Sequence, residues 1–179
     1  MKKWIRFDYK EDKSLIGTQD GDYVDEFEGD LLENPKPTGR KIPLNEVQLQ
    51  SPFEPHSIFA LWNNFHERAE KEGQTIPHVP LYFMKPLTSV IGPEQTIYRP
   101  LGHQGRVIFE AELGIVIGSK CRKVSESEAA EYIFGYTCVN DVTAIEFLFE
   151  DKAFQQWTRS KGYDTFTPIG PCIATGIDT

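Results

Sequence analysis

Two glutamates in the middle of the chain have the spacing of metal ligands. Glu110 and Glu112 lie in the run VIFEAELGIVIG (residues 107–118), whose β-branched and aromatic residues predict a largely buried strand. Because side chains alternate along a strand, both glutamates point to one face and Ala111 points away. Two buried carboxylates side by side repel each other, so we expect a cation between them.

Asp141 ends the next predicted strand, YTCVND, where functional groups commonly lie. A third acidic ligand completes an all-carboxylate set of the kind that magnesium prefers, with manganese or calcium as alternative ions. Water or substrate oxygens complete the coordination of such an ion. The competing interpretation is that Glu110 and Glu112 form the solvent-facing side of an edge strand.

A lysine and a histidine–glutamate pair are further candidates for chemistry. Lys161, in the segment RSKGYDTF, could bind an acidic substrate or stabilise an enolate beside a metal ion, although a single lysine is most often a solvated surface charge. His66 and Glu70 stand four residues apart on a predicted helix, so the carboxylate could orient the imidazole to activate water. Ordinary charge pairing on an exposed helix explains that spacing equally well.

The N-terminal segment that precedes these residues predicts a small β-meander. Its β-forming residues fall in three runs, 4–9, 14–17 and 22–25. Asp20-Gly21 is a favoured hairpin turn between the last two runs. Residues 33–43 contain three prolines and a glycine, so we interpret them as a linker. We expect a small N-terminal β domain with its linker at residues 1–45 and a catalytic domain at residues 46–179.

The second predicted domain combines short strands with short helices. His66 lies on a helix predicted at residues 65–72, and prolines and glycines break residues 79–116 into several strands. Ser125 and Glu128 form a capping box, which opens a helix predicted to run to Gly135. The domain is therefore expected to be mixed α/β and rich in strands.

The composition limits the class of protein. A chain of 179 residues, 39% of them hydrophobic, is long enough for a core, and its net charge of −8 disfavours a nucleic-acid partner. No run approaches the roughly 20 apolar residues of a membrane span, and the N-terminus MKKWIRFDYKEDK lacks the apolar core of a secretory signal. We expect no membrane partner, a cytoplasmic location and three free cysteines.

Several ordered segments together resemble the fumarylacetoacetate hydrolase superfamily, in particular its 2-hydroxyhepta-2,4-diene-1,7-dioate isomerase and acylpyruvase-like members. VIFEAELGIVIG, GYTCVNDVTA and QQWTRSKGYDTFTPIGPCI match in order and spacing. IFALWNNFHERAE looks like that family's histidine-bearing lid segment, and YFMKPLTSVIGP looks like its strand with a lysine-proline step. The resemblance covers roughly residues 57–175.

The resemblance implies a fold, a metal and a substrate class. The fold is a β-roll, usually in a homodimer, with magnesium at the positions of Glu110, Glu112 and Asp141 and with Lys161 as the active-site lysine. The substrates are small 2-oxo or β-diketo acids, whose oxygens chelate the metal. The implied reaction is hydrolysis of a carbon–carbon bond in aromatic catabolism, with decarboxylation, tautomerisation or isomerisation as alternatives.

The chain departs from the family pattern in three places. Ile145 and Leu148 stand where many members have an arginine and a glutamine that contact substrate. Members typically have a glutamate three residues after the histidine, where this chain has Ala69 and then Glu70. The sequence ends at Thr179, before the strands that close the family's roll, so we expect exposed strand edges and apolar faces unless another chain covers them. A non-catalytic half-domain that needs a complementary chain, and a metal-binding module without catalysis, are therefore alternatives to an enzyme.

Overall fold

One large sheet joins the N-terminal strands to the C-terminal part of the chain. The computed structural model describes residues 1–177. The strands of this sheet are β1 (Lys2–Tyr9), β2 (Asp12–Asp20), β3 (Tyr23–Glu28), β4 (Lys36–Pro43), β5 (Gln48–Leu49), β8 (Val90–Ile91), β10 (Ala111–Ile117), β11 (Ile133–Asn140) and β13 (Thr167–Thr175). Their order is β10-β11-β13-β1-β2-β3-β4, with β5 beside β1 and β8 beside β13. The neighbours along this order pair antiparallel, whereas β8 runs parallel to β13.

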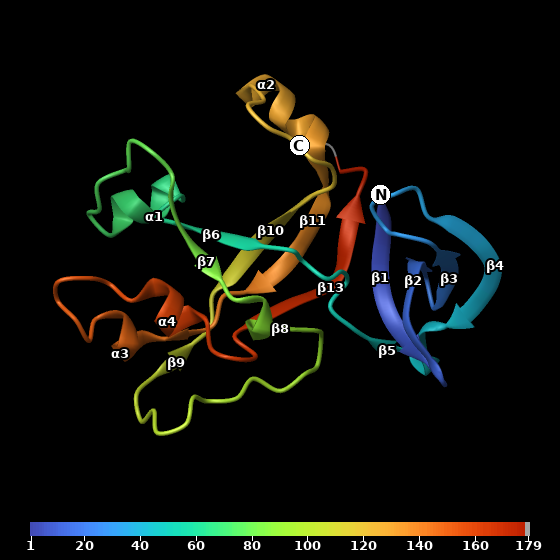
Figure 1. Cartoon of the computed structure of the whole chain (residues 1–179), viewed down its shortest axis with the longest axis horizontal. Helices are drawn as coiled ribbons and strands as arrows, with labels where there is room; N and C mark the ends of the chain where they lie inside the picture. Colours follow the sequence, from blue (N-terminus) through green and yellow to red (C-terminus); the bar gives the residue numbers. More distant parts are fainter. Residues whose placement is uncertain (178–179) are drawn as a thin grey trace.

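The remaining strands and the α-helices are short and lie on the other side of β13 from the N-terminal strands (Figure 1). Two small antiparallel sheets consist of β6 (Ile58–Trp62) with β7 (Leu81–Lys85), and of β9 (Val107–Ile108) with β12 (Thr143–Ala144). The helices are α1 (His66–Lys71), α2 (Glu126–Ala129), α3 (Ile145–Leu148) and α4 (Trp157–Lys161), and 3-10 turns cover residues 44–46, 87–89 and 130–132. The molecule is thus β-rich with few helical residues, as predicted.

The N-terminal strands form the predicted meander around an apolar core. The hairpin turn lies one residue further along than predicted, because Asp20 pairs with Tyr23 and leaves Gly21 and Asp22 in the turn. Gly21 has a φ of 58°, which glycine adopts without strain. The fully buried apolar residues here, called the N-terminal core below, are Ile5, Phe7, Val24 and Ile42.

The proline-rich segment is a strand, so its interpretation as a linker is wrong. Residues 36–43 form β4, which pairs with β3 and has no other neighbour among the described residues. A strand at the edge of a sheet tolerates Pro37 and Pro43. Proline has no backbone N–H, and a backbone nitrogen that faces away from the neighbouring strand has no hydrogen bond to donate within the sheet. The domain border at residue 45 stays a prediction, and the sheet is continuous across it through the pairing of β1 with β13.

The helix that begins after Ser125 is shorter than predicted. The capping box of Ser125 and Glu128 is present, but α2 ends at Ala129 and β11 already starts at Ile133. Gly135 lies inside β11, where an added Cβ would come within 2.5 Å of the Ala174 carbonyl oxygen of β13. The glycine therefore allows two strands to approach closely and does not end a helix.

The run at residues 107–118 is broken and only half buried, which corrects the prediction of one largely buried strand. Phe109 and Glu110 separate β9 from β10. Strand β10 lies at the edge of the sheet, and one of its faces is exposed because no other element of the described chain packs on it. The apolar residues on that face, called the β10 edge face, are Leu113, Ile115 and Ile117.

The small sheet of β6 and β7 also exposes an apolar face. Residues directly opposite each other in an antiparallel pair share a face, and Leu61 is opposite Tyr82 as Phe59 is opposite Met84. These four side chains, all at least half exposed, form the outer face of β6–β7. The exposed apolar faces expected from the sequence are therefore present in the described residues.

Two simpler expectations can also be compared with the structure. The three cysteines are free thiols, as predicted: Cys121 and Cys138 are exposed, and Cys172 is partly buried. Among residues 1–177, no helix is both long and apolar enough to cross a membrane. The cytoplasmic location stays a prediction.

Candidate active site

Lys161 lies at the centre of the predicted site and is buried. It is the last residue of α4 and is only 3% exposed. Its ammonium donates hydrogen bonds to Asp141 Oδ2 at 2.7 Å and Thr143 Oγ1 at 2.8 Å, and it forms an ion pair with Glu110 Oε2. The alternative interpretation of Lys161 as a solvated surface charge is therefore wrong.

The backbone holds two of the predicted metal ligands together. Asp141 directly follows β11, and its amide donates to the carbonyl oxygen of Glu110 at 2.9 Å. The amide of Glu110 donates in turn to Asn140 Oδ1 at 3.3 Å. The break between β9 and β10 thus places Glu110 at the end of β11, beside Asp141.

Lys85 belongs to the site, although the sequence indicated it only as the lysine of a lysine-proline step and assigned it no role. It ends β7, is 3% exposed, and its ammonium donates to Asp141 Oδ1 at 2.5 Å and to the carbonyl oxygen of Lys161 at 2.6 Å. Burial lowers the pKa of Lys85, and the neighbouring Asp141 carboxylate opposes that shift. The available signal was a single charge at the end of the apolar run LYFMK, because a buried charge requires a partner. Lys85, Asp141, Thr143 and Lys161 are called the charged cluster below.

Glu112 is near Glu110 and Asp141, and its carboxylate has no hydrogen-bond or ion-pair partner among the described residues. It lies on β10 and is half-buried. Burial raises the pKa of Glu112, and the Glu110 and Asp141 carboxylates raise it further. Glu112 is therefore close enough to the other two acids to feel their charge, and its carboxylate oxygens have no hydrogen-bond partner among residues 1–177.

The acids do not stand at coordination distances from one centre. Across residues 1–177, no three acidic, histidine or cysteine side chains are close enough together to share one metal ion. The ammonium of Lys161 lies between Glu110 and Asp141 and contacts an oxygen of each. The other oxygen of Glu110 makes no hydrogen bond to the described residues, so this donor set still offers hard oxygen ligands.

Arg68 on α1 is a cation near Glu110 and Glu112, and the sequence did not indicate it as a candidate residue. A hydrogen bond to Glu72 at 2.9 Å raises the pKa of Arg68, and the charges of Glu110 and Glu112 raise it further. The helix α1 therefore lies within electrostatic reach of the site.

The structure does not bring His66 and Glu70 together. Both side chains are exposed on α1, and no hydrogen bond between them occurs in the described part of the chain. The i,i+4 pair that does form on this helix is Arg68 with Glu72. The proposed use of His66 in activating water thus has no orienting partner in this geometry.

The two positions where the sequence departs from polar family residues lie on α3. Leu148 is buried, and Ile145 is partly buried. Glu146, between them, pairs with Arg106 at 3.3 Å at the surface. Neither Ile145 nor Leu148 supplies a polar group to the charged cluster.

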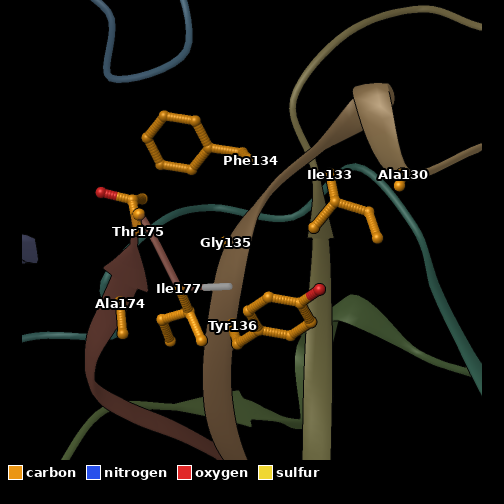
Figure 2. A pocket seen from close by; sticks show the side chains of 9 residues that line it. Ala130, Ile133, Phe134, Gly135, Tyr136, Ala174, Thr175 and Ile177 are labelled. Carbon is orange, nitrogen blue, oxygen red and sulfur yellow. The ribbon is translucent and has the colours of Figure 1, made fainter. Parts of the chain in front are cut away.

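Two cavities lie outside this site. One, of about 330 Å³, is at the ends of β11 and β13, where Figure 2 shows the side chains of Phe134, Tyr136 and Ile177 around it. The other, of about 400 Å³, lies between Arg6 and Gln95. None of the predicted site residues lines either cavity.

Comparison with known families accounts for most of the chain. Residues 57–178 match the model described as the C-terminal domain of fumarylacetoacetate (FAA) hydrolase, and residues 2–52 match the Rv2993c-like N-terminal domain. The first match contains all six predicted site residues. It also contains Lys85 and Arg68.

Individual relatives agree with these matches. An uncharacterized protein of Archaeoglobus fulgidus is 44% identical over 149 residues, which are 83% of this chain and 57% of that protein. The crystal structure of 2-hydroxyhepta-2,4-diene-1,7-dioate isomerase from Mycobacterium marinum has a TM-score of 0.86 and 33% identity, over 99% of this chain and 68% of that one. A maleylpyruvate hydrolase from Sphingobium, in complex with manganese(II) and pyruvate, shares the fold at 24% identity and a TM-score of 0.73, over 97% of this chain and 67% of that one.

The chain spans about half the length of the curated relatives that it matches. Within that span, the family model covers well over half of the residues, and the fold agrees with solved members over nearly the whole chain. The chain therefore belongs to the fumarylacetoacetate hydrolase family.

Proposed function

We propose that this chain binds a small 2-oxo or β-diketo acid and hydrolyses a carbon–carbon bond in it with the help of a magnesium ion. The observation that carries the proposal is the buried ammonium of Lys161 among Glu110, Asp141 and Thr143. With Glu110 and Asp141 taken up as ligands of an ion, this buried ammonium would be free to stabilise negative charge that develops on a substrate. Membership of a family whose solved relatives include an isomerase and a maleylpyruvate hydrolase supports the proposal.

Glu110, Glu112 and Asp141 are the residues that would hold the ion. Three carboxylates suit magnesium, manganese or calcium, and the unpartnered Glu112 supports this assignment because an ion would relieve its repulsion with the other two acids. When bound, the ion would polarise a substrate carbonyl as a Lewis acid. Manganese occupies the structure of the maleylpyruvate hydrolase from Sphingobium.

The two buried lysines have different roles: Lys161 stabilises charge on the substrate, and Lys85 positions other groups of the site. In the proposed reaction, water adds to the carbonyl carbon beyond the scissile bond, and the bonding electrons move into the 2-oxo acid as an enolate. Lys161 balances the negative charge of that enolate, which then takes up a proton at carbon. Lys85 holds Asp141 and the last carbonyl of α4 in place, so it acts as a positioning residue.

The exposed His66 favours a second reaction type. Hydrolysis needs a base that activates water, whereas decarboxylation releases carbon dioxide to leave an enolate, and tautomerisation or isomerisation needs only proton transfer to and from the enolate. Because His66 and Glu70 are exposed and not hydrogen-bonded to each other, an oxaloacetate-like or 2-hydroxymuconate-like acid is the alternative substrate class. A His66→Ala variant with full turnover would identify that second class.

A substrate panel tests both candidates. Acylpyruvates, oxaloacetate and unsaturated 2-hydroxy diacids are assayed with magnesium and again with EDTA. We expect turnover of at least one acid and its loss in EDTA. Turnover that persists in EDTA contradicts the metal-dependent proposal.

The exposed apolar faces favour a role in assembly as another candidate. The outer face of β6–β7 and the β10 edge face leave large apolar side chains in contact with water, which is typical of surfaces that pair with another chain. The partner would be a second copy in a homodimer or a complementary chain. Sedimentation with a magnesium titration tests this: a chain that binds no metal and turns over no acid alone, but does both with a partner, is a half-domain.

A further inference from the structure

Three aromatic side chains lie in a row beside Lys161. Trp157 stacks on Phe83 with 5.7 Å between ring centroids, and it contacts Trp62 at 5.5 Å. The Lys161 ammonium is 5.7 Å from the centre of the Phe83 ring and 6.0 Å from that of Trp157. Trp62, Phe83 and Trp157 are called the aromatic wall below.

The elements explain why these rings share one side of the site. Trp157 and Lys161 are four residues apart on α4, so they lie on the same face of the helix. Phe83 and Lys85 alternate on β7, and Trp62 lies opposite Leu81, on that same inner face of β6–β7. The wall therefore begins beside the charged cluster and leads away from it.

Burial shows on which side the site opens. Thr143 and the neighbouring Phe166 are fully buried and Asp141 is buried, so the site is closed to water on their side. The three rings of the wall and Glu112 are each only half-buried. The water-facing side of the site therefore lies along the aromatic wall, and that is where the tail of a bound acid would extend.

The spacing of residues along β7 gives the length of ligand that the aromatic wall could contact. Residues on one face of a strand repeat about every 7 Å, so Phe83 is about 7 Å and the Trp62 position about 13 Å from Lys85. This distance accommodates a 2-oxo acid head followed by one ring. Flat, unsaturated groups gain most from stacking on aromatic faces.

Given the proposed function, on which this inference rests, we propose that the aromatic wall selects 2-oxo or β-diketo acids with an aromatic tail. Trp62, Phe83 and Trp157 are then specificity-determining residues. Acids that end in a methyl group reach the charged cluster but leave the wall unused. Acids with a methyl tail should bind more weakly than acids with an aromatic tail, because they cannot stack on these rings.

Turnover of two matched substrates tests the wall. The ratio of kcat/KM for benzoylpyruvate to that for acetopyruvate should be at least about tenfold in the natural chain, as expected for contact with two rings. Trp62→Leu should lower this ratio about tenfold, mainly through KM, and Trp157→Phe should retain most of it. The matched control is Tyr82→Leu, on the outer face of the same small sheet, which should leave the ratio unchanged. Equal losses for both substrates in Trp62→Leu would mean that Trp62 only supports the fold, and they would overturn the proposal.

A binding measurement separates failure of the wall from failure of the proposed function. Two of the three tryptophans of the chain belong to the wall, so their fluorescence reports on it. With magnesium present, 4-phenyl-2-oxobutanoate should quench this fluorescence and bind about tenfold more tightly than 2-oxobutanoate. Neither acid has the second carbonyl that hydrolysis requires. Tighter binding of the phenyl compound without turnover of any acid would overturn the proposed function but not the role of the aromatic wall. Equal affinities for the two compounds would overturn the selectivity proposed for the wall.

Discussion

Two buried interiors of this molecule are stabilised in opposite ways. The N-terminal core consists of apolar side chains that are 0–1% exposed: Ile5, Phe7, Val24 and Ile42. The charged cluster is nearly as buried, at 1–6% exposed, but contains two ammonium groups, a carboxylate and a hydroxyl: Lys85, Lys161, Asp141 and Thr143. Burial alone therefore does not distinguish a core from a site.

The difference lies in what each interior tolerates. An apolar core gains free energy in proportion to the area removed from water, so another apolar side chain of similar volume serves nearly as well. A buried charge is stable only while its partners remain, because desolvation of an unpaired ion costs several kcal/mol. Substitutions that conserve volume should thus have small effects in the core and large effects in the cluster.

The largest effect on stability is expected for Lys85→Met. This change keeps most of the side-chain volume but leaves one Asp141 oxygen and the Lys161 carbonyl without a donor, so the free energy of unfolding should fall by about 3 kcal/mol. Urea unfolding measures the change. Lys13→Met removes the exposed pair with Asp8 and, as the control, should cost about 1 kcal/mol or less. Equal costs for the two lysines would remove the proposed contrast.

Lys161→Met should lower turnover about 100- to 1000-fold, because it removes the cation that faces the developing negative charge. Steady-state kinetics with the acid found in the substrate panel measures this effect. The control is Arg159→Met, which removes an exposed cation of the same helix that pairs with Glu150. If both variants retain full kcat, Lys161 has only a structural role.

In the N-terminal core, Ile5→Leu should lower the free energy of unfolding by less than about 1.5 kcal/mol, because it conserves volume and polarity. Turnover should stay unchanged, since Ile5 touches no residue of the charged cluster. Urea unfolding and the same kinetic assay provide the two measurements. A loss as large as that of Lys85→Met would show that packing precision, not charge pairing, limits both interiors.

The smallest effect is expected for Glu112→Gln, and its sign depends on pH. Because the folded state raises the pKa of Glu112, folding favours the protonated acid, and stability is lost as pH rises from the ordinary glutamate value through the raised pKa. In EDTA at neutral pH the glutamine variant should therefore be more stable, by about 1 kcal/mol or less after solvent screening. This gain should disappear in acid.

Thermal unfolding at pH 7.5 and pH 4.5 measures this difference. The exposed Glu94→Gln is the control and should show no comparable gain. A glutamine variant that is less stable at neutral pH would contradict the repulsion among the three acids. Addition of magnesium should reverse the order, because the carboxylate is the better ligand.

The linear order of the sequence was sufficient to predict several features. Alternating apolar residues predicted β1 to β3, because the period of a strand is local. The family resemblance, carried by consecutive segments, was confirmed by the match at residues 57–178. The roles of Glu110, Glu112 and Asp141 as metal ligands remain predictions from that same order.

Other features were decided only when distant segments met. Lys85 contacts Asp141 and Lys161, which are 56 and 76 positions away, and no local pattern encodes such a contact. The prolines of β4 resembled a linker because only the tertiary structure places that strand at an edge. Glu110 proved to be paired with a lysine, and His66 and Glu70 proved to be exposed.

The physical reason is the same in each case. Periodicity reports which side chains share a face, whereas burial and charge pairing depend on what that face meets. The sequence by itself determined the N-terminal strands β1 to β3, the family and the identity of the candidate acids. Only the tertiary structure decided that Lys161 is buried among them, that Lys85 supports them, and that the β10 edge face is exposed.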